Sequence, residues 1–260
     1  MSALPVVLVP VGVDDDALDA CLAALDAGTP AGTRVWLADD AQAGPRGLAI
    51  VERWLARTAL QADYTRRPRP IGEAAHLDDM LKACGDADVL VLSSDAVPCP
   101  GWATQLVACA ARAAAALPPH HPELPAAVDH ALFLRGSARR KAGGLDAASY
   151  ASSYVALIDL SLRMAGLGWR NALCETAFVA RRGEGRPLGD DVETLGVRWP
   201  TWHARLAQFL MQDPLHALRA SLGHAFDNAE LRTQPDLFAR PDPEQEADAA
   251  GVGTVDGSSP

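Results

Sequence analysis

Short apolar runs separated by polar turns mark the first half of the chain. Pro5–Val11 (PVVLVPV), Thr33–Leu37 (TRVWL) and Val89–Leu92 (VLVL) are such runs, and Ala62–Arg66 is a weaker one. A short continuous apolar run between turn signals is typical of a strand that is buried on both faces of a sheet. The pattern therefore predicts four strands in the first 92 residues.

Helical periodicity fills the gaps between these runs. Leu18, Cys21, Leu22 and Leu25 follow the spacing i, i+3, i+4, i+7. The acidic run at 14–16 offers a cap for the start of this helix, and a glycine at 28 offers its stop. Apolar residues at 50, 51, 54 and 55 predict a second helix, and residues 72–84 a third. Alternating strands and helices predict an α/β fold, with a mostly parallel sheet flanked by helices on both faces.

The pattern becomes less regular after Trp102. An Ala-rich helix is expected to run to about Ala116. The elements expected after it are, in chain order, a strand at Val128–Leu134, a helix at Tyr154–Gly166, an extended segment at Arg170–Val179, a loop at Gly183–Gly196 and two helical segments within Trp199–Leu222. We therefore predict a main domain over residues 1–197, a C-terminal helical extension over 198–232 and a disordered acidic tail over 233–260.

Composition narrows the classes of protein. The chain has 260 residues, is 49% hydrophobic and carries a formal net charge of −10, which argues against a general nucleic-acid binder. No apolar run approaches the roughly 20 residues that span a bilayer, and the N-terminus lacks a signal-peptide pattern. A cytoplasmic location is expected, with peripheral association at a membrane left open. The five cysteines are scattered, so neither a zinc site nor a disulfide framework is predicted.

Acidic residues follow several of the predicted strands. They lie in the loop after Val11, at Asp39–Asp40 and at Asp95. In open α/β sheets the carboxyl ends of the strands meet at one edge, and ligands bind beyond that edge. Converging carboxylates repel one another unless a ligand or a cation compensates their charge. A nucleotide diphosphate with a divalent cation would do so, although other doubly wound enzymes share this layout.

The order of these segments resembles family 2 glycosyltransferases of the GT-A fold, most closely the rhamnosyltransferase-like members. Leu8–Val13 (LVPVGV) is similar to the opening VIPVYN strand, and Trp36–Ala41 (WLADDA) to the VVDDGS motif. Gly72–Asp78 (GEAAHLD) is similar to GxxAAxNxG, and Leu92–Trp102 (LSSDAVPCPGW) to LLNSDTxxPPGW. Arg139–Asp146 (RRKAGGLD) resembles RxxxxxVGGFD. A trailing RWPxW…DPLxxLR pattern at 198–219 extends the resemblance to roughly residues 5–222.

The resemblance implies a nucleotide-diphosphate sugar as donor and Mg²⁺ or Mn²⁺ as cofactor. Asp40, with Asp39 beside it, would contact the base or ribose, and Asp95 would bind the cation, which offsets charge on the leaving diphosphate. The other residues that it assigns to the nucleotide site are Pro10, Val11, Asp78, Ser93 and Ser94.

The catalytic-base motif departs from the family. An inverting transfer needs a carboxylate to accept the acceptor hydroxyl's proton, and the family supplies it from E-D-x-D-L-x-x-R. Asp159 and its downstream partners match, but Ala156 and Leu157 replace the acid pair. Asp159 or Asp146 could serve instead, with His130 as a weaker candidate. The histidine that often follows is absent, with Ala180–Arg181 in its region.

Two functions from different classes follow. The first is transfer of a hexose from a nucleotide-diphosphate sugar to a glycan or lipid-linked acceptor, in bacterial surface polysaccharide biosynthesis. The second is a catalytically degenerate domain that binds a nucleotide, a glycan or a protein partner without turnover. A nucleotidyltransferase is disfavoured, because no Gly-rich phosphate loop follows the first strand.

Overall fold

The computed structural model describes residues 5–114, 122–127, 129–183 and 185–222. Residues up to Pro214 belong to one compact unit, and the chain from Leu215 onward forms a second unit. In the second unit residues 216–222 are helical. The first unit contains all the predicted site residues.

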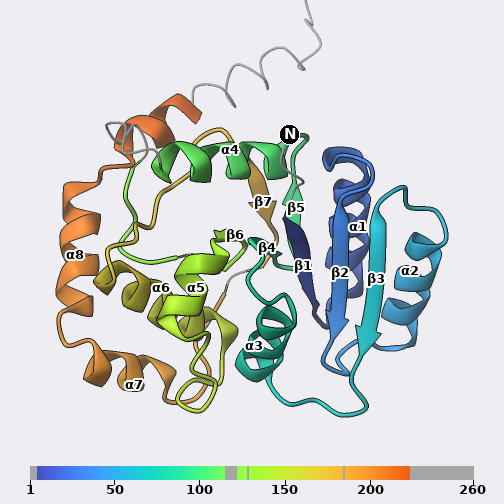
Figure 1. The fold of residues 1–260 in the computed structure, drawn as a ribbon, viewed down its shortest axis with the longest axis horizontal. Coiled ribbons are helices and arrows are strands. Elements are labelled where there is room, and N and C mark those ends of the chain that lie inside the picture. Colours follow the sequence, from blue (N-terminus) through green and yellow to red (C-terminus); the bar gives the residue numbers. More distant parts are fainter. Residues whose placement is uncertain (1–4, 115–121, 128, 184, 223–260) are drawn as a thin grey trace, which may run out of the picture. The chain divides into compact units, whose positions relative to one another are not determined.

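A five-stranded sheet forms the centre of this unit, in the order β3-β2-β1-β4-β6 (Figure 1). The strands are β1 (Val6–Val11), β2 (Arg34–Asp39), β3 (Gln61–Arg66), β4 (Val89–Leu92) and β6 (Ala131–Leu134). The first four are parallel, and β6 pairs with β4 in the antiparallel direction. Alternate residues of β1 enter two different hydrophobic cores, with Val7 and Val9 in one and Leu8 in the other. Burial on both faces explains why these strands are continuous apolar runs.

Helices cover both faces of the sheet. They are α1 (Asp15–Gly28), α2 (Pro45–Leu55), α3 (Glu73–Ala83), α4 (Trp102–Ala114), α5 (Gly136–Ala142), α6 (Ser153–Gly166), α7 (Asp191–Arg198) and α8 (Trp202–Gln212). The core that contains Val7 includes apolar side chains of α1, α2 and α4, and the core that contains Leu8 includes those of α3 and α6. Asp14 caps α1 as expected, because its carboxylate accepts a hydrogen bond from the Ala17 amide at 2.9 Å.

Two short strands form a separate ribbon. They are β5 (Ala96–Pro98) and β7 (Val179–Arg181), and they pair antiparallel with Ala96 opposite Arg181. The sequence pattern does not predict β5, because three residues are too few for a recognisable alternation. The pairing matters for function, since it brings residue 181 beside the end of β4.

The predicted α/β architecture is confirmed, and two of the finer predictions are wrong. The loop predicted over Gly183–Gly196 contains the start of α7, where Leu195 is the one buried apolar side chain, too little for a periodic signal. The extended segment predicted over Arg170–Val179 makes an isolated bridge at Ala172 and turns near residue 175, so strand pairing begins only at its last residue. The segment contains neither Pro nor Gly, so the sequence does not indicate that turn.

Some predictions fall outside the described residues. Val128, residues 115–116 of the Ala-rich helix and the tail from 233 onward lie there. The division at 197/198 stays a prediction, although Trp202 of α8 is buried in the core that contains Leu8. Over the part of the chain that the structure describes, no helix combines the length and apolar character needed to cross a membrane.

Candidate functional site

The carboxyl ends of β1 and β4 are tied together at one edge of the sheet. The Gly12 amide, directly after β1, donates a 2.9 Å hydrogen bond to Ser94 Oγ in the turn after β4. A Cβ at position 12 would lie only 2.9 Å from the same oxygen, so a glycine is needed for this approach. The predicted residues Pro10 and Val11 of β1 are therefore brought beside Ser93 and Ser94.

Asp95 lies next to this junction and is paired with an arginine. Its two carboxylate oxygens lie 2.9 and 3.1 Å from Arg181 Nε, and Ser93 Oγ donates to the same carboxylate. Arg181 Nη1 in turn donates to Asp129 Oδ1 at 2.7 Å, just before β6. The three charged side chains are only 13–22% exposed. We call Asp95, Asp129 and Arg181 the guanidinium cluster.

Both charges of the central ion pair are stable near neutral pH. Burial alone would raise the pKa of Asp95, but the hydrogen bonds from Ser93 and Arg181 outweigh it and lower that pKa. Burial alone would lower the pKa of Arg181, but Asp95 and Asp129 raise it above the ordinary value. Burial also lowers the pKa of the neighbouring His130, so this imidazole is neutral at pH 7.

The residues around Asp95 do not fit a divalent cation in this arrangement. Within the described ranges, no three His, Cys, Asp or Glu side chains converge as metal ligands. The guanidinium separates the two carboxylates, and a +2 ion about 4 Å from it would be repelled by roughly 8 kcal/mol at an effective dielectric constant of about 20. A Cβ at Gly183 would overlap Asp95 Oδ2, and one at Gly185 would overlap Asp129. The chain after β7 thus packs directly against both acids.

Asp39 is satisfied within the protein. Its side chain is fully buried, and it accepts hydrogen bonds from the Gln42 amide at 2.6 Å and the Tyr64 hydroxyl at 2.8 Å. Arg66 Nη1 lies 3.1 Å away and compensates the charge. Burial, together with the hydrogen bond to Asp39, raises the pKa of Tyr64 to about 12. Asp39 therefore holds the end of β2 and its loop in place.

Asp40 is occupied in a similar way. Its carboxylate accepts hydrogen bonds from the amides of Ile71, at 2.9 and 3.0 Å, and Gly72, at 2.8 Å. His76 Nδ1 lies 3.8 Å from Oδ1. This carboxylate orders the turn that leads into α3. The contact of Asp40 with a base or ribose stays a prediction.

Asp78, on α3, contacts the chain at Leu145, directly before the candidate general base Asp146. It accepts a hydrogen bond from the Leu145 amide at 2.9 Å and pairs with Lys82 Nζ at 2.6 Å. The side chain is only 7% exposed. These bonds fix the Gly-Gly turn at 143–144 against α3.

Asp159 is a buried residue of α6. Its fully buried carboxylate accepts from Arg163 Nε at 2.8 Å and Trp199 Nε1 at 2.9 Å, and lies 3.3 Å from Arg198 Nε. Ala156, which replaces one acid of the family motif, is also fully buried. Asp159 thus holds the junction of α6 and α7, and nothing of its carboxylate is open to a substrate.

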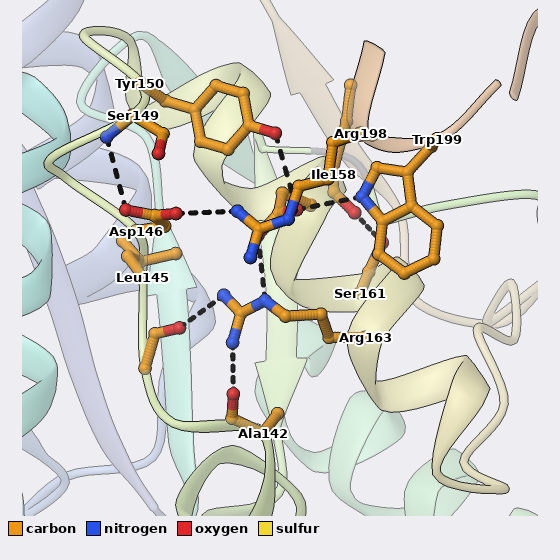
Figure 2. Close-up of polar contacts among 12 residues, drawn as sticks. Ala142, Leu145, Asp146, Ser149, Tyr150, Ile158, Ser161, Arg163, Arg198 and Trp199 are labelled. Atoms are coloured by element: carbon orange, nitrogen blue, oxygen red, sulfur yellow. Dashed lines mark hydrogen bonds and ion pairs between the residues drawn. The ribbon is translucent and has the colours of Figure 1, made fainter. Parts of the chain in front are cut away.

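Asp146 faces an open hollow of about 690 Å³. The hollow is lined by Asp146, Ser149, Asp190, Glu193, Thr194, Val197 and Arg198. Figure 2 shows Arg198 beside Asp146, to which its Nη1 donates at 2.6 Å. Arg198 Nε lies 3.3 Å from the buried Asp159 carboxylate, so one guanidinium joins the two acids. Burial alone would raise the pKa of Asp146, but the bonds from Arg198 and Ser149 lower it, which keeps the carboxylate ionised.

The predicted residues therefore form separate groups. Pro10, Val11, Ser93, Ser94 and Asp95 meet at the ends of β1 and β4. Asp146 and Asp159 meet through Arg198, and neither that hollow nor a second one beside α1 and α2 is lined by Asp40 or Asp95.

Sequence reasoning missed three residues of these groups, Asp129, Arg181 and Arg198. The signal for Arg181 was its place in the region where the resemblance expects a histidine. Arg198 is the first residue of the RWPxW pattern of the resemblance, and Asp129 had no signal in the sequence.

Comparisons with known proteins identify the fold and little else. No protein-family model matches the sequence, and no curated protein matches it. The structure is similar to S. aureus TarS 1-349 in complex with UDP-GlcNAc, at 16% identity and a TM-score of 0.53, over 74% of this chain and 65% of that one. It is also similar to mannosyltransferase PcManGT from Pyrobaculum calidifontis in complex with GDP-Man and Mn²⁺, at 15% identity and a TM-score of 0.50, over 88% of this chain and 81% of that one.

A further similar structure is GalNAc-T7 with UDP, GalNAc and Mn²⁺, at 11% identity and a TM-score of 0.61, over 78% of this chain and 49% of that one. Against the longer S. aureus TarS structure, the chain spans 38% of the known protein's length. At these identities the likeness concerns the fold, and a rhamnosyltransferase subfamily stays a prediction. A mostly parallel sheet flanked by helices and these neighbours together establish that the chain has the GT-A fold of glycosyltransferases.

Proposed function

We propose that this protein binds a nucleotide-diphosphate sugar at the carboxyl ends of β1 and β4 and transfers its hexose to a glycan or lipid-linked acceptor, in surface polysaccharide biosynthesis. The observation that carries the proposal is the bond from the Gly12 amide to Ser94 Oγ, which joins the two strand ends beside Asp95. This is the edge where open α/β sheets bind ligands. The known structures with UDP-GlcNAc and GDP-Man support the same class of donor.

The nucleotide would also contact the turn that Asp40 orders. Because the Asp40 carboxylate already accepts from the Ile71 and Gly72 amides, we assign it the role of shaping this turn. The Ile71 side chain is 43% exposed, and Val13, next to Gly12, is 73% exposed. Two exposed apolar side chains that flank a polar strand edge suit the faces of a base and a ribose.

Asp146 is the candidate general base. Transfer requires the acceptor oxygen to attack the anomeric carbon while the bond to the diphosphate oxygen breaks and the acceptor proton leaves. Of the two predicted acids, Asp146 has a side chain that is 26% exposed, while that of Asp159 is fully buried. Asp146 also lines the 690 Å³ hollow, which is large enough for a sugar acceptor.

The second candidate function is binding without turnover. It is favoured by the replacement of the family's acid pair by Ala156 and Leu157, which are 0 and 2% exposed in the core. It is also favoured by the pairing of Asp146 with Arg198, since an ion-paired carboxylate is a weaker proton acceptor.

A donor panel separates the two functions. Thermal shift with UDP-glucose, UDP-GlcNAc, GDP-mannose and dTDP-rhamnose measures binding, because a ligand of the folded form raises its Tm. Release of the nucleoside diphosphate measures turnover. We expect one donor to bind and turn over, and Asp146→Asn to keep binding while turnover falls about 10²–10⁴-fold.

Glu52→Gln, an exposed acid on α2, is the matched control and should change neither measurement. Binding with no turnover in the wild type would favour the second function. Failure of every donor to bind would refute the proposed donor site and leave only the glycan- or protein-binding form of the second function.

A further inference from the structure

Arg181 is built into the place where the resemblance expects a metal site. It comes from β7, and the pairing of Ala96 with Arg181 sets it beside Asp95, 86 residues away in sequence. Its side chain is 18% exposed and lies between two carboxylates. An arginine held by two acids has a fixed orientation, so its remaining donors are preorganised for a ligand.

The guanidinium cluster leaves donors unused. Arg181 Nε donates to Asp95 and Arg181 Nη1 donates to Asp129, while Arg181 Nη2 makes no hydrogen bond within the part of the chain that the structure describes. A guanidinium has five N–H donors in a planar fork, which matches the oxygens of a phosphate group. One guanidinium faces two carboxylates, so the cluster keeps a net charge of −1 and Arg181 stays ionised between its partners.

A divalent cation and this arginine compete for the same carboxylate. A metal on Asp95 would have to displace Arg181 and then find ligands from a backbone that packs directly against both acids at Gly183 and Gly185. Mg²⁺ prefers six oxygen ligands in near-octahedral geometry, and Asp95 and Asp129 would supply only part of that set.

From these contacts we propose that Arg181 replaces the divalent cation, so that the protein binds a nucleoside diphosphate without a metal. The inference rests on the proposed donor site and changes its chemistry. Arg181 donates hydrogen bonds from Nη2 to the diphosphate oxygens, and Asp95 and Asp129 act as positioning residues that hold the guanidinium. The predicted cation-binding role of Asp95 is then replaced by a role in orienting Arg181.

Calorimetry in two buffers tests the inference on the wild-type protein. UDP, GDP, ADP, dTDP and inorganic pyrophosphate are titrated once with EDTA and once with Mn²⁺. We expect at least one of them to bind with affinities that agree within about threefold in the two buffers. Binding that occurs only with Mn²⁺ would overturn the inference and leave the proposed function standing. Failure of all five probes in both buffers would refute the proposed function, and the inference with it.

Two variants test the residue. In EDTA, Arg181→Gln should weaken binding at least tenfold, and Arg181→Lys, which keeps the charge but loses the fork, should weaken it less. Arg182→Gln removes the same charge from the next, exposed position and should bind as the wild type does.

If Arg181→Gln fails to fold, the lysine variant and the wild-type comparison still decide the question. Unchanged binding by both variants at 181 would overturn the inference. In folded Arg181→Gln the two acids are released, and we expect Mn²⁺ to bind this variant more tightly than the wild type. Equal Mn²⁺ affinities would also count against it.

Discussion

The buried carboxylate of Asp159 gives the sharpest test of the division between structural and catalytic acids. Its Oδ2 accepts from Arg163, and its Oδ1 faces Trp199 Nε1 at 2.9 Å, the Tyr150 hydroxyl at 3.4 Å and Arg198 Nε at 3.3 Å. Asp159→Asn keeps the shape but replaces one oxygen by an NH₂ group, which must then face a donor on one side or the other.

The expected loss follows from these contacts. A hydrogen bond to a charged group contributes about 1.5–3 kcal/mol, and removing one partner of a buried ion pair costs roughly 3–5 kcal/mol. We expect Asp159→Asn to lower the free energy of unfolding by about 3–5 kcal/mol, because Arg163 and Arg198 lose their shared counter-charge. For a unit of this size the Tm should fall by roughly 6–20 °C.

Urea unfolding followed by circular dichroism measures this loss, and the m-value should stay unchanged. The control is Glu52→Gln, an exposed acid that should change the free energy of unfolding by less than about 0.5 kcal/mol. A loss below about 1 kcal/mol in Asp159→Asn, combined with abolished turnover, would refute the structural role and restore Asp159 as the base.

Two further changes probe other contacts. Gly183→Ala should destabilise by about 1–3 kcal/mol in urea unfolding, because the added methyl overlaps Asp95 Oδ2, whereas Gly166→Ala, with open space around it, should not; equal losses would contradict this geometry. Burial alone would raise the pKa of Asp191, but the Ser152 hydroxyl and nearby amides lower it, so its contribution is complete above the ordinary pKa of about 3.9 and is lost as the pH falls through the lowered pKa. The stability gap between the wild type and Asp191→Asn should therefore be largest at pH 7 and shrink below about pH 4; a gap that widens in acid would contradict this prediction.

The parts of the fold that bury a continuous apolar run could be predicted from the sequence. Val6–Val11 and Val89–Leu92 are such runs. The start of α1 could also be predicted, because Asp14 caps the helix through a hydrogen bond to an amide only three residues away. By contrast, α7 depends on the Asp191 carboxylate, which accepts from Ser152 at a separation of 39 residues. Contacts of that range leave no periodic trace in a single sequence.

The candidate site divides in the same way. Asp95 could be singled out because it directly follows an apolar strand. Its pairing with Arg181 could not, because it requires the β5–β7 ribbon, whose strands have three residues each. Asp159 could be singled out because it matches a motif of the resemblance. Its burial and its four donor contacts could not, because they depend on the tertiary structure.

The β5–β7 ribbon also determines when, during synthesis of the chain, the contacts of Asp95 can form. Ser94 reaches Gly12 once the first hundred residues are present, but Asp95 has to wait for a partner that emerges 86 residues later. A nascent chain therefore carries this acid without its counter-ion over a long stretch of synthesis, and closing so large a loop is slow and entropically costly. Fragments that end before Val179 will expose it permanently, so any recombinant piece intended for ligand studies must extend past β7.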